Sequence, residues 1–281
     1  MATKYYYWSN GRAQEFADNN SIEPERGDVR VSGGVDLKLA NMQFDPRKRT
    51  SLNRAALAAR IEKELGDEAE TSFERPSPVG WAKGMGRVNF AHIVGTRTTD
   101  KMVLMHAQPL DPEGRRVDLC MFGSAEHLRP FKLTDPYADG HVSSDAMVIE
   151  HLLRGLGAPV DVTTGEEDLE YVGWAAVWLA LNQGFRGPHH EYVDRPWLRD
   201  FALGHSEACE WMTEVNWDIT RTAGRWGAAP QVGDWHRVII GSPLWVRTAN
   251  PESLVRYRRL RSRSRRWSLQ CLVGLGRGHG R

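Results

Sequence analysis

The segment from Glu166 to Asn182 constrains the fold of this chain more than any other part of its sequence. Its first turn is acidic, and Thr164 with Glu167 fits the S/T-x-x-E capping box found at helix N-termini. Beyond that turn the segment is apolar at almost every position, so a helix formed here is apolar on all sides. Such a helix has to lie inside a structure, which predicts a globular protein with a central buried helix.

Three other segments have the spacing or the end signals of helices. In the first, apolar residues recur every four positions, and in the last a proline stands at the N-terminal end. The predicted helices cover residues 51–66, 144–156 and 197–212. In the last helix, His205 and Cys209 would share one face with apolar residues, so Cys209 is predicted to be a buried, unreactive thiol.

Short apolar runs that are rich in β-branched and aromatic residues, and that turn-forming residues separate, predict strands. They cover Lys4–Trp8, a hairpin between Val29 and Leu39, Val88–Val94, Met102–Ala107, Val117–Phe122, Trp235–Ile240 and Leu244–Arg247. The connections between the three central strands are too short for a parallel crossover, which favours an antiparallel meander. Gly241-Ser242-Pro243 predicts a turn between the last two strands.

These elements together predict an α+β fold with a single domain over residues 1–250. A mainly antiparallel sheet, closed by Trp235–Val246, would pack against four to five helices. Residues 251–281 would add a basic helix and a Gly-rich disordered tail. The sequence has no apolar run as long as a membrane-spanning helix and no apolar signal segment at its start, and its three widely spaced cysteines favour the reducing cytoplasm.

The net charge of +1 conceals an uneven distribution of charge along the chain. Residues 161–220 contain 12 acidic and 3 basic residues, whereas residues 251–281 contain 9 basic residues and 1 acidic residue. Two such blocks either attract one another within the molecule or bind separate partners of opposite charge. The sequence leaves both alternatives open.

A loop expected between two helices contains the densest group of potential ligands and bases, namely His189, His190, Glu191 and Asp194. Imidazole and carboxylate groups can bind a transition metal, or act as a general base and its orienting partner. Adjacent histidines point in different directions on regular backbone, which favours a polar surface loop instead. A hydrolase, with or without a metal, is the functional alternative. No motif for a cofactor or for nucleotide phosphates is present, so no cofactor is predicted.

The strongest compositional signal is a run of seven arginines within eleven residues near the C-terminus. Guanidinium groups pair with phosphates and the flanking Tyr257 and Trp267 could stack on bases, which would suit single-stranded nucleic acid. The run could instead solvate the end of the chain, dock on the acidic block, or result from a shifted reading frame. The residues are Arg256, Arg258, Arg259, Arg261, Arg263, Arg265 and Arg266.

Four further residues are candidates for a ligand pocket. Trp174 and Trp178 stand four positions apart in the central helix, where aromatic side chains can line a pocket but more often fill a core. Ser124 and Ser242 each follow a glycine at the expected end of a strand, where N–H groups and hydroxyls could face a cleft. Ordinary turn chemistry also accounts for both serines.

Three short motifs coincide with expected strands and turns. They are Tyr5-Tyr6-Tyr7-Trp8-Ser9, Phe122-Gly123-Ser124-Ala125-Glu126-His127-Leu128 and Gly241-Ser242-Pro243-Leu244-Trp245-Val246. In these motifs the chain resembles an uncharacterised family of proteins from filamentous actinobacteria, whose members open with a Tyr-Tyr-Tyr-x-Ser strand and carry Gly-Ser turns after strands. The resemblance implies an accessory role in bacterial conflict or signalling loci, and it supplies no catalytic residue.

The polar residues of this chain form no recognisable reaction centre. The sequence therefore predicts a non-enzymatic cytoplasmic binding or regulatory protein, with a protein partner and without a membrane. Hydrolysis by the loop at 189–194 and nucleic-acid binding by the Arg-rich C-terminus are the alternatives.

Overall fold

The chain forms two compact units. The computed structural model describes residues 3–22, 46–71, 73–74, 78–94, 102–129, 146–155, 169–181, 199–221 and 235–249. One unit consists of Met1–Ser9 and Ala69–Arg281, and the other is Asn10–Glu68. The smaller unit is therefore an insertion between the first strand and the rest of the larger unit.

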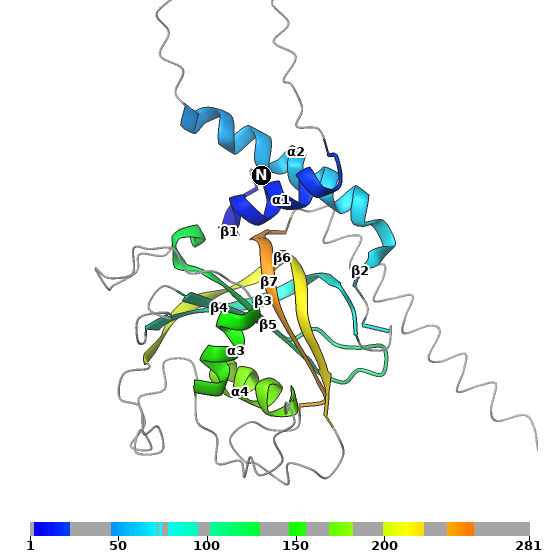
Figure 1. Ribbon diagram of the computed structural model, residues 1–281, viewed down its shortest axis with the longest axis vertical. Helices are drawn as coiled ribbons and strands as arrows, with labels where there is room; N and C mark the ends of the chain where they lie inside the picture. Colours follow the sequence, from blue (N-terminus) through cyan, green and yellow to red (C-terminus); the bar gives the residue numbers. More distant parts are fainter. Residues whose placement is uncertain are drawn as a thin grey trace, which may run out of the picture. The chain divides into compact units, whose positions relative to one another are not determined.

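Five strands of the larger unit close into a mixed barrel, which Figure 1 shows as the group of crossing arrows. They are β3 (Trp81–Val94), β4 (Met102–Ala107), β5 (Val117–Ser124), β6 (Arg199–Thr220) and β7 (Arg237–Thr248). β3 pairs antiparallel with both β4 and β6, and β5 pairs antiparallel with β4. β7 pairs antiparallel with β6 and parallel with β5. The closed order is therefore β3-β4-β5-β7-β6 and back to β3.

Two short strands extend this barrel at its margins. β1 (Tyr5–Trp8) pairs antiparallel with β7, and β2 (Ala69–Glu70) pairs parallel with the first residues of β3. β1 confirms the strand predicted at the start of the chain. Both short strands bring chain segments to the ends of the barrel, and this placement matters for the site described below.

The barrel interior is narrow, because a ring of only five strands encloses little space. Trp211 of β6 points inward and is almost completely buried. Gly84 lies opposite Trp211 in the pairing of β3 with β6, and a Cβ atom there would lie 2.5 Å from the indole ring. Gly86 lies under the same ring. The glycines of β3 thus make room for the largest residue of the interior.

Alternate residues of the barrel strands belong to two apolar clusters. The inner cluster has members from all five barrel strands, among them Val88, Phe90, Met105, Leu119, Met121, Trp211 and Ile239. The outer cluster joins the other face of the strands to α3 (Ala146–Gly155) and α4 (Leu169–Leu181), and these helices lie against one side of the barrel in Figure 1. Nine of the 13 residues of α4 are buried, which confirms the prediction of a buried apolar helix.

The inserted unit contains α1 (Asn10–Asn19) and α2 (Pro46–Leu65), followed by the short 3-10 helix η1 (Gly66–Glu68). α2 confirms the helix predicted over 51–66 and begins five residues earlier, at a proline, which suits a first helical position. α1 was not predicted. Its buried residues are Ala13 and Ala17, and two alanines are a weak periodic signal.

The predicted α+β fold, with a mainly antiparallel sheet packed on helices, is wrong: the sheet closes on itself into a mixed barrel. One error is the helix predicted over 197–212, because residues 199–212 belong to β6. Cys209 and Trp211 point inward and Glu210 points to the other face, so this segment has the period of two of a strand. The apolar residues of this segment also fit the spacing of a helix, and only the pairing with β3 and β7 decides between helix and strand.

The turn predicted at Gly241-Ser242-Pro243 is also wrong, because these residues lie inside the continuous strand β7. Proline lacks an N–H group and is tolerated in a strand at irregular pairings. Pro243 lies opposite Thr213, next to a register shift in the pairing of β6 with β7. The two strands lie close together here, and Gly241 allows this because a Cβ atom at that position would lie 2.8 Å from Thr213 Oγ1.

Most other predicted elements are confirmed. The meander of β3, β4 and β5 is antiparallel as expected, β4 has the predicted bounds, and α3 lies within the helix predicted over 144–156. The hairpin between Val29 and Leu39 and the basic helix and tail over 251–281 lie outside the described residues. Within the described part of the chain, no helix is long and apolar enough to cross a membrane.

Candidate functional site

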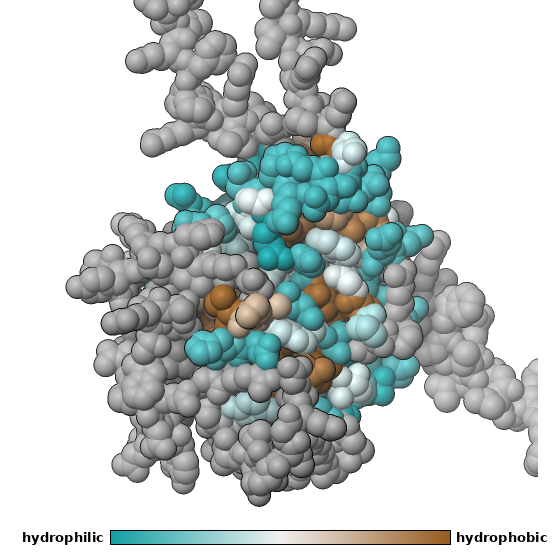
Figure 2. Space-filling view, viewed as in Figure 1, coloured by the Kyte–Doolittle hydropathy of each residue, from teal (hydrophilic) through white to brown (hydrophobic). Residues whose placement is uncertain are grey.

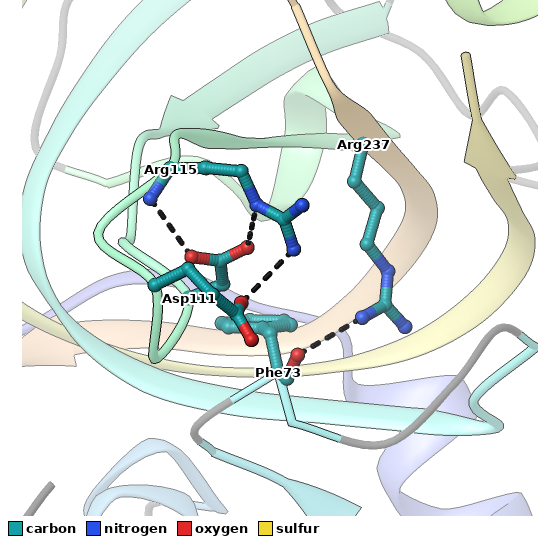
Figure 3. A network of polar contacts seen from close by, with 5 residues as sticks. Phe73, Asp111, Arg115 and Arg237 are labelled. Atoms are coloured by element: carbon teal, nitrogen blue, oxygen red, sulfur yellow. Dashed lines mark hydrogen bonds and ion pairs between the residues drawn. The ribbon is translucent and has the colours of Figure 1, made fainter. Parts of the chain in front are cut away.

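Buried charged side chains gather at one end of the barrel, where β4 and β6 end and β5 and β7 begin. Arg237, the first residue of β7, donates from Nε to Asp218 Oδ1 at 2.8 Å and from Nη2 to Asp218 Oδ2 at 2.6 Å. Its Nη1 donates to the carbonyl oxygen of Phe73 at 3.1 Å, a contact drawn in Figure 3. Asp218 Oδ2 also accepts from the N–H of Val79 at 3.1 Å. We call Glu70, Phe73, Asp218 and Arg237 the mouth network.

Phe73 is the apolar member of the mouth network. Its side chain is 3% exposed and belongs to the inner cluster of the barrel. Its N–H donates to Glu70 Oε1 at 2.7 Å, so both backbone polar groups of Phe73 bind charged side chains. Phe73 has φ +57°, a left-handed conformation that costs a residue with a side chain about 1–3 kcal/mol. Burial of the ring and the two hydrogen bonds have to offset that cost.

The loop between β4 and β5 contributes a second pair of charges, shown in Figure 3. Arg115 donates from its backbone N–H and from Nε to the two carboxylate oxygens of Asp111, both at 2.8 Å, and from Nη2 to Glu113 at 2.9 Å. Burial opposes ionisation of Asp111, but these hydrogen bonds prevail and lower its pKa. The arrangement stabilises the turn, in which Gly114 has φ +78°.

Electrostatics favour the charged form of Arg237. The hydrogen bonds to Asp218 raise the pKa of Arg237 against the effect of burial, and the charges of Asp218, Glu70 and Asp111 add to the rise. The guanidinium group is therefore a permanent cation at the end of the barrel, held in place by a bidentate carboxylate.

A separate group of polar side chains lies on the outer face of β4 and β5, and we call it the hairpin network. Asp118 is completely buried; its Oδ1 accepts from His106 Nε2 at 3.0 Å and from Gln108 Nε2 at 2.9 Å. Arg116 Nε donates to Asp118 Oδ2 at 3.0 Å. Burial raises the pKa of Asp118, but the hydrogen bonds and the charges of His106 and Arg116 outweigh it, so the pKa is lowered.

Cys120 lies directly opposite His106 in the pairing of β4 with β5, so a thiol, an imidazole and a carboxylate share one face of the hairpin. This combination could form a catalytic triad only if the thiol were exposed and acidic. Cys120 is completely buried, and burial raises its pKa well above the ordinary value. The trio is therefore part of the core. In the described residues, no three His, Cys, Asp or Glu side chains could hold a metal ion.

The structure confirms that the Cys209 thiol is buried, although Cys209 lies on a strand and not on a helix. Its side chain belongs to the inner cluster, and burial raises its pKa to about 11. His205, expected beside it on a helix face, instead points outward, where its Nε2 lies 3.2 Å from Glu207.

The other residues predicted for a site divide into those outside and those inside the described part. His189, His190, Glu191 and Asp194, and the seven arginines from Arg256 to Arg266, lie outside it, so the hydrolase and nucleic-acid interpretations of these residues stay predictions. Trp174 and Trp178 stack on one another in α4 with ring centroids 6.4 Å apart and pack partly buried against the outer cluster.

Ser124 and Ser242 are both buried, so neither hydroxyl faces an open cleft. Ser242 donates to Asn216 Oδ1 of β6 at 3.0 Å. The two serines lie on the neighbouring parallel strands β5 and β7, on the face of the sheet that carries the outer cluster. The structure does not join them to the mouth network.

No sequence pattern predicted the mouth network, although Asp218 belongs to the acidic block over residues 161–220. Asp218 and Glu210 of β6 pair with Arg237 and Arg247 of β7; Arg247 Nε donates to Glu210 Oε2 at 2.7 Å. Part of the acidic excess is therefore neutralised by arginines of β7, the strand that follows. The available signal was a single charged residue within an apolar run, as at Arg237 before three aliphatic residues.

The opposite end of the barrel is closed by tyrosines of β1. Tyr6 packs against Phe90, with ring centroids 5.4 Å apart, and its hydroxyl accepts from Ser206 Oγ at 3.1 Å. Tyr7 covers Gly123, where a Cβ atom would clash with the tyrosine ring. With Phe73 at one end and these tyrosines at the other, the barrel interior is filled by the protein's own side chains.

Comparisons with protein-family models, curated proteins and solved structures found no match. The resemblance to an actinobacterial family therefore stays a prediction. The connectivity of the barrel follows from its pairings: the five strands, taken in chain order as one to five, follow the order 1-2-3-5-4-1, with strands three and five parallel and α3 and α4 between strands three and four.

Proposed function

We propose that this protein is a non-enzymatic binding protein that holds a protein partner on the outer surface of its barrel. The observation that carries the proposal is the closed five-stranded barrel, whose connectivity resembles that of the OB fold, a five-stranded Greek-key barrel. Barrels of this kind bind ligands on outer strands and loops.

The burial of reactive groups supports binding over catalysis. The thiols of Cys120 and Cys209 are buried and have raised pKa values, and the His106 side chain is buried in contact with the carboxylate of Asp118. The side chains that fill both ends of the barrel leave its outside as the surface for a partner. Both described thiols are free, which suits a reducing compartment, and we place the function in the cytoplasm as part of the proposal.

The part of the outer face of β3 and β6 around Arg87, His205 and Glu207 is the surface that we assign to the partner, since none of these residues belongs to the outer cluster against which α3 and α4 pack. Its exposed residues carry mixed charge: Glu207 lies 3.4 Å from Arg87 and 3.2 Å from His205. On the one side of the molecule that Figure 2 shows, polar residues dominate among the described residues, with smaller apolar patches between them. A surface of balanced charge suits a protein partner better than a phosphate backbone, which requires an excess of cations.

Charge reversal on this face tests the proposal. Tagged full-length protein should retain a partner from the source cells, and Arg87→Glu with His205→Glu should release it, because both substitutions add repulsion at exposed sites. Lys63→Glu in α2 is the matched control and should retain the partner. The same protein should show no turnover on esterase, phosphatase and peptidase substrates. Turnover that is lost in His106→Asn would overturn the proposal.

Nucleic-acid binding is the second candidate, and the OB connectivity together with the run of arginines favours it. Fluorescence anisotropy with a labelled single-stranded oligonucleotide tests it directly. If this candidate is correct, affinity falls steeply as salt rises, and truncation after Pro251 abolishes binding. Binding that is absent, or that does not depend on salt, excludes it.

A further inference from the structure

Phe73 is held in the end of the barrel as a ligand would be held. The nearest strand pairings of its segment are those of β2, at Ala69 and Glu70, and of β3, from Trp81 onward. Between them, the N–H of Phe73 binds Glu70 Oε1 at 2.7 Å and its carbonyl oxygen binds Arg237 Nη1 at 3.1 Å. Side chains, and not a strand ladder, therefore hold this residue in place.

The backbone conformation of Phe73 is unfavourable in this position. Its φ of +57° belongs to the left-handed region, which a side chain with a Cβ atom rarely adopts. Strained residues persist only where their surroundings impose the conformation, and they concentrate at ligand clamps and switches. Here the surroundings are the inner apolar cluster and two charged side chains.

The receiving groups do not depend on Phe73 for their own positions. Arg237 is anchored by two hydrogen bonds to Asp218, and Asp218 also binds the N–H of Val79. Val117, the partner of Arg237 in the pairing of β5 with β7, belongs to the same inner cluster as the phenyl ring. An apolar space with one fixed guanidinium donor would therefore persist if Phe73 left it.

The position of Phe73 in the chain gives this arrangement a regulatory use. The inserted unit ends at Glu68, so Phe73 lies within the first residues of the chain that enters the barrel. We propose that the end of the barrel is a receptor for an aromatic residue and its backbone carbonyl, that Phe73 occupies it in cis, and that a partner peptide with an exposed aromatic residue displaces Phe73.

The charges around the receptor define the ligand further. Arg237 offers Nη1 to an acceptor, but Asp218, Glu70 and Asp111 all contribute negative charge near it. A neutral carbonyl therefore suits the receptor better than a carboxylate. This site is separate from the outer face of β3 and β6, so an experiment can disprove the proposed receptor while the proposed function still holds.

Binding of N-acetylphenylalanine amide to the full-length Phe73→Ala variant tests the proposal by calorimetry. We expect saturable binding to this variant, and binding to the wild type weaker by at least about tenfold, because Phe73 competes in cis. N-acetylphenylalanine, with its carboxylate, should bind more weakly than the amide. Phe90→Ala is the matched control, since it removes another buried phenyl ring of the inner cluster but leaves Phe73 in place.

A folded Phe73→Ala variant that binds the amide no better than Phe90→Ala overturns the proposal. Hydrogen exchange of the wild type provides a test that requires no variant. The Phe73 amide should exchange at least about tenfold faster than the paired amides of β4, because displacement is a local opening. Exchange of the Phe73 amide only at the rate of global unfolding would show that Phe73 does not leave the end of the barrel, and would also overturn the proposal.

Discussion

His106 Nε2 lies 3.0 Å from Asp118 Oδ1 across the β4–β5 hairpin, and both side chains are almost completely buried. A carboxylate in such a place remains charged only because its hydrogen bonds replace the lost water. The hairpin network therefore links the stability of the barrel to the ionisation of Asp118.

Acid should reduce the stability that the hairpin network contributes to the barrel. The pKa of Asp118 is lowered in the folded protein by its partners despite burial, so the unfolded chain binds a proton more readily. The contribution to stability is complete above the ordinary aspartate pKa of about 3.9 and is lost as pH falls through the lower folded value. Urea unfolding between pH 7 and pH 3 should show this loss, and Asp118→Asn should flatten that part of the curve. An unchanged pH profile in Asp118→Asn would contradict the assignment.

Removal of Arg237 should strongly destabilise the protein. Arg237→Met leaves Asp218 buried without its bidentate partner, and breaking such a buried pair costs about 3–5 kcal/mol. Arg87→Met is the control, because the pair of Arg87 with Glu207 lies 54% and 69% exposed and a surface pair contributes about 0–1 kcal/mol. Denaturant unfolding measures both values. Equal effects of the two substitutions would disprove the structural role of the mouth network.

Two glycines of β3 should respond differently to the same substitution. A Cβ atom at Gly84 would lie 2.5 Å from the Trp211 ring, so Gly84→Ala should cost about 1–3 kcal/mol as overpacking. At Gly86 the nearest ring atom would lie at 3.5 Å, an ordinary contact, so Gly86→Ala should be tolerated. Thermal unfolding of both variants checks the expectation. Similar melting temperatures would argue against Trp211 lying over Gly84.

The thiols of Cys120 and Cys209 should be protected in the native protein. Both are buried and have raised pKa values, so little thiolate is available to react. A thiol reagent at pH 8 should modify them only at the rate of unfolding, and fully in denaturant. The variant Cys271→Ser isolates these two residues for the measurement. Fast labelling of the native variant would show that one of them is exposed.

Local patterns were sufficient for much of the secondary structure. The bounds of β4, the antiparallel meander and the buried character of α4 follow from short apolar runs, short connections and an uninterrupted apolar sequence. These features depend on residues close together in the chain, where period and turn chemistry are informative. β6 was mistaken for a helix because its first half fits both periods, and its partners lie far away in sequence.

The candidate site required contacts that no local pattern contains. Arg237 and Asp218 are 19 positions apart, and they meet because β6 and β7 pair antiparallel. Phe73 is 164 positions from the guanidinium group that binds its carbonyl oxygen. Periodicity in the sequence determined which residues are buried and where most strands and helices form. Only the closure of the barrel decided which charges face one another, because strand pairing between distant segments sets the register across the sheet.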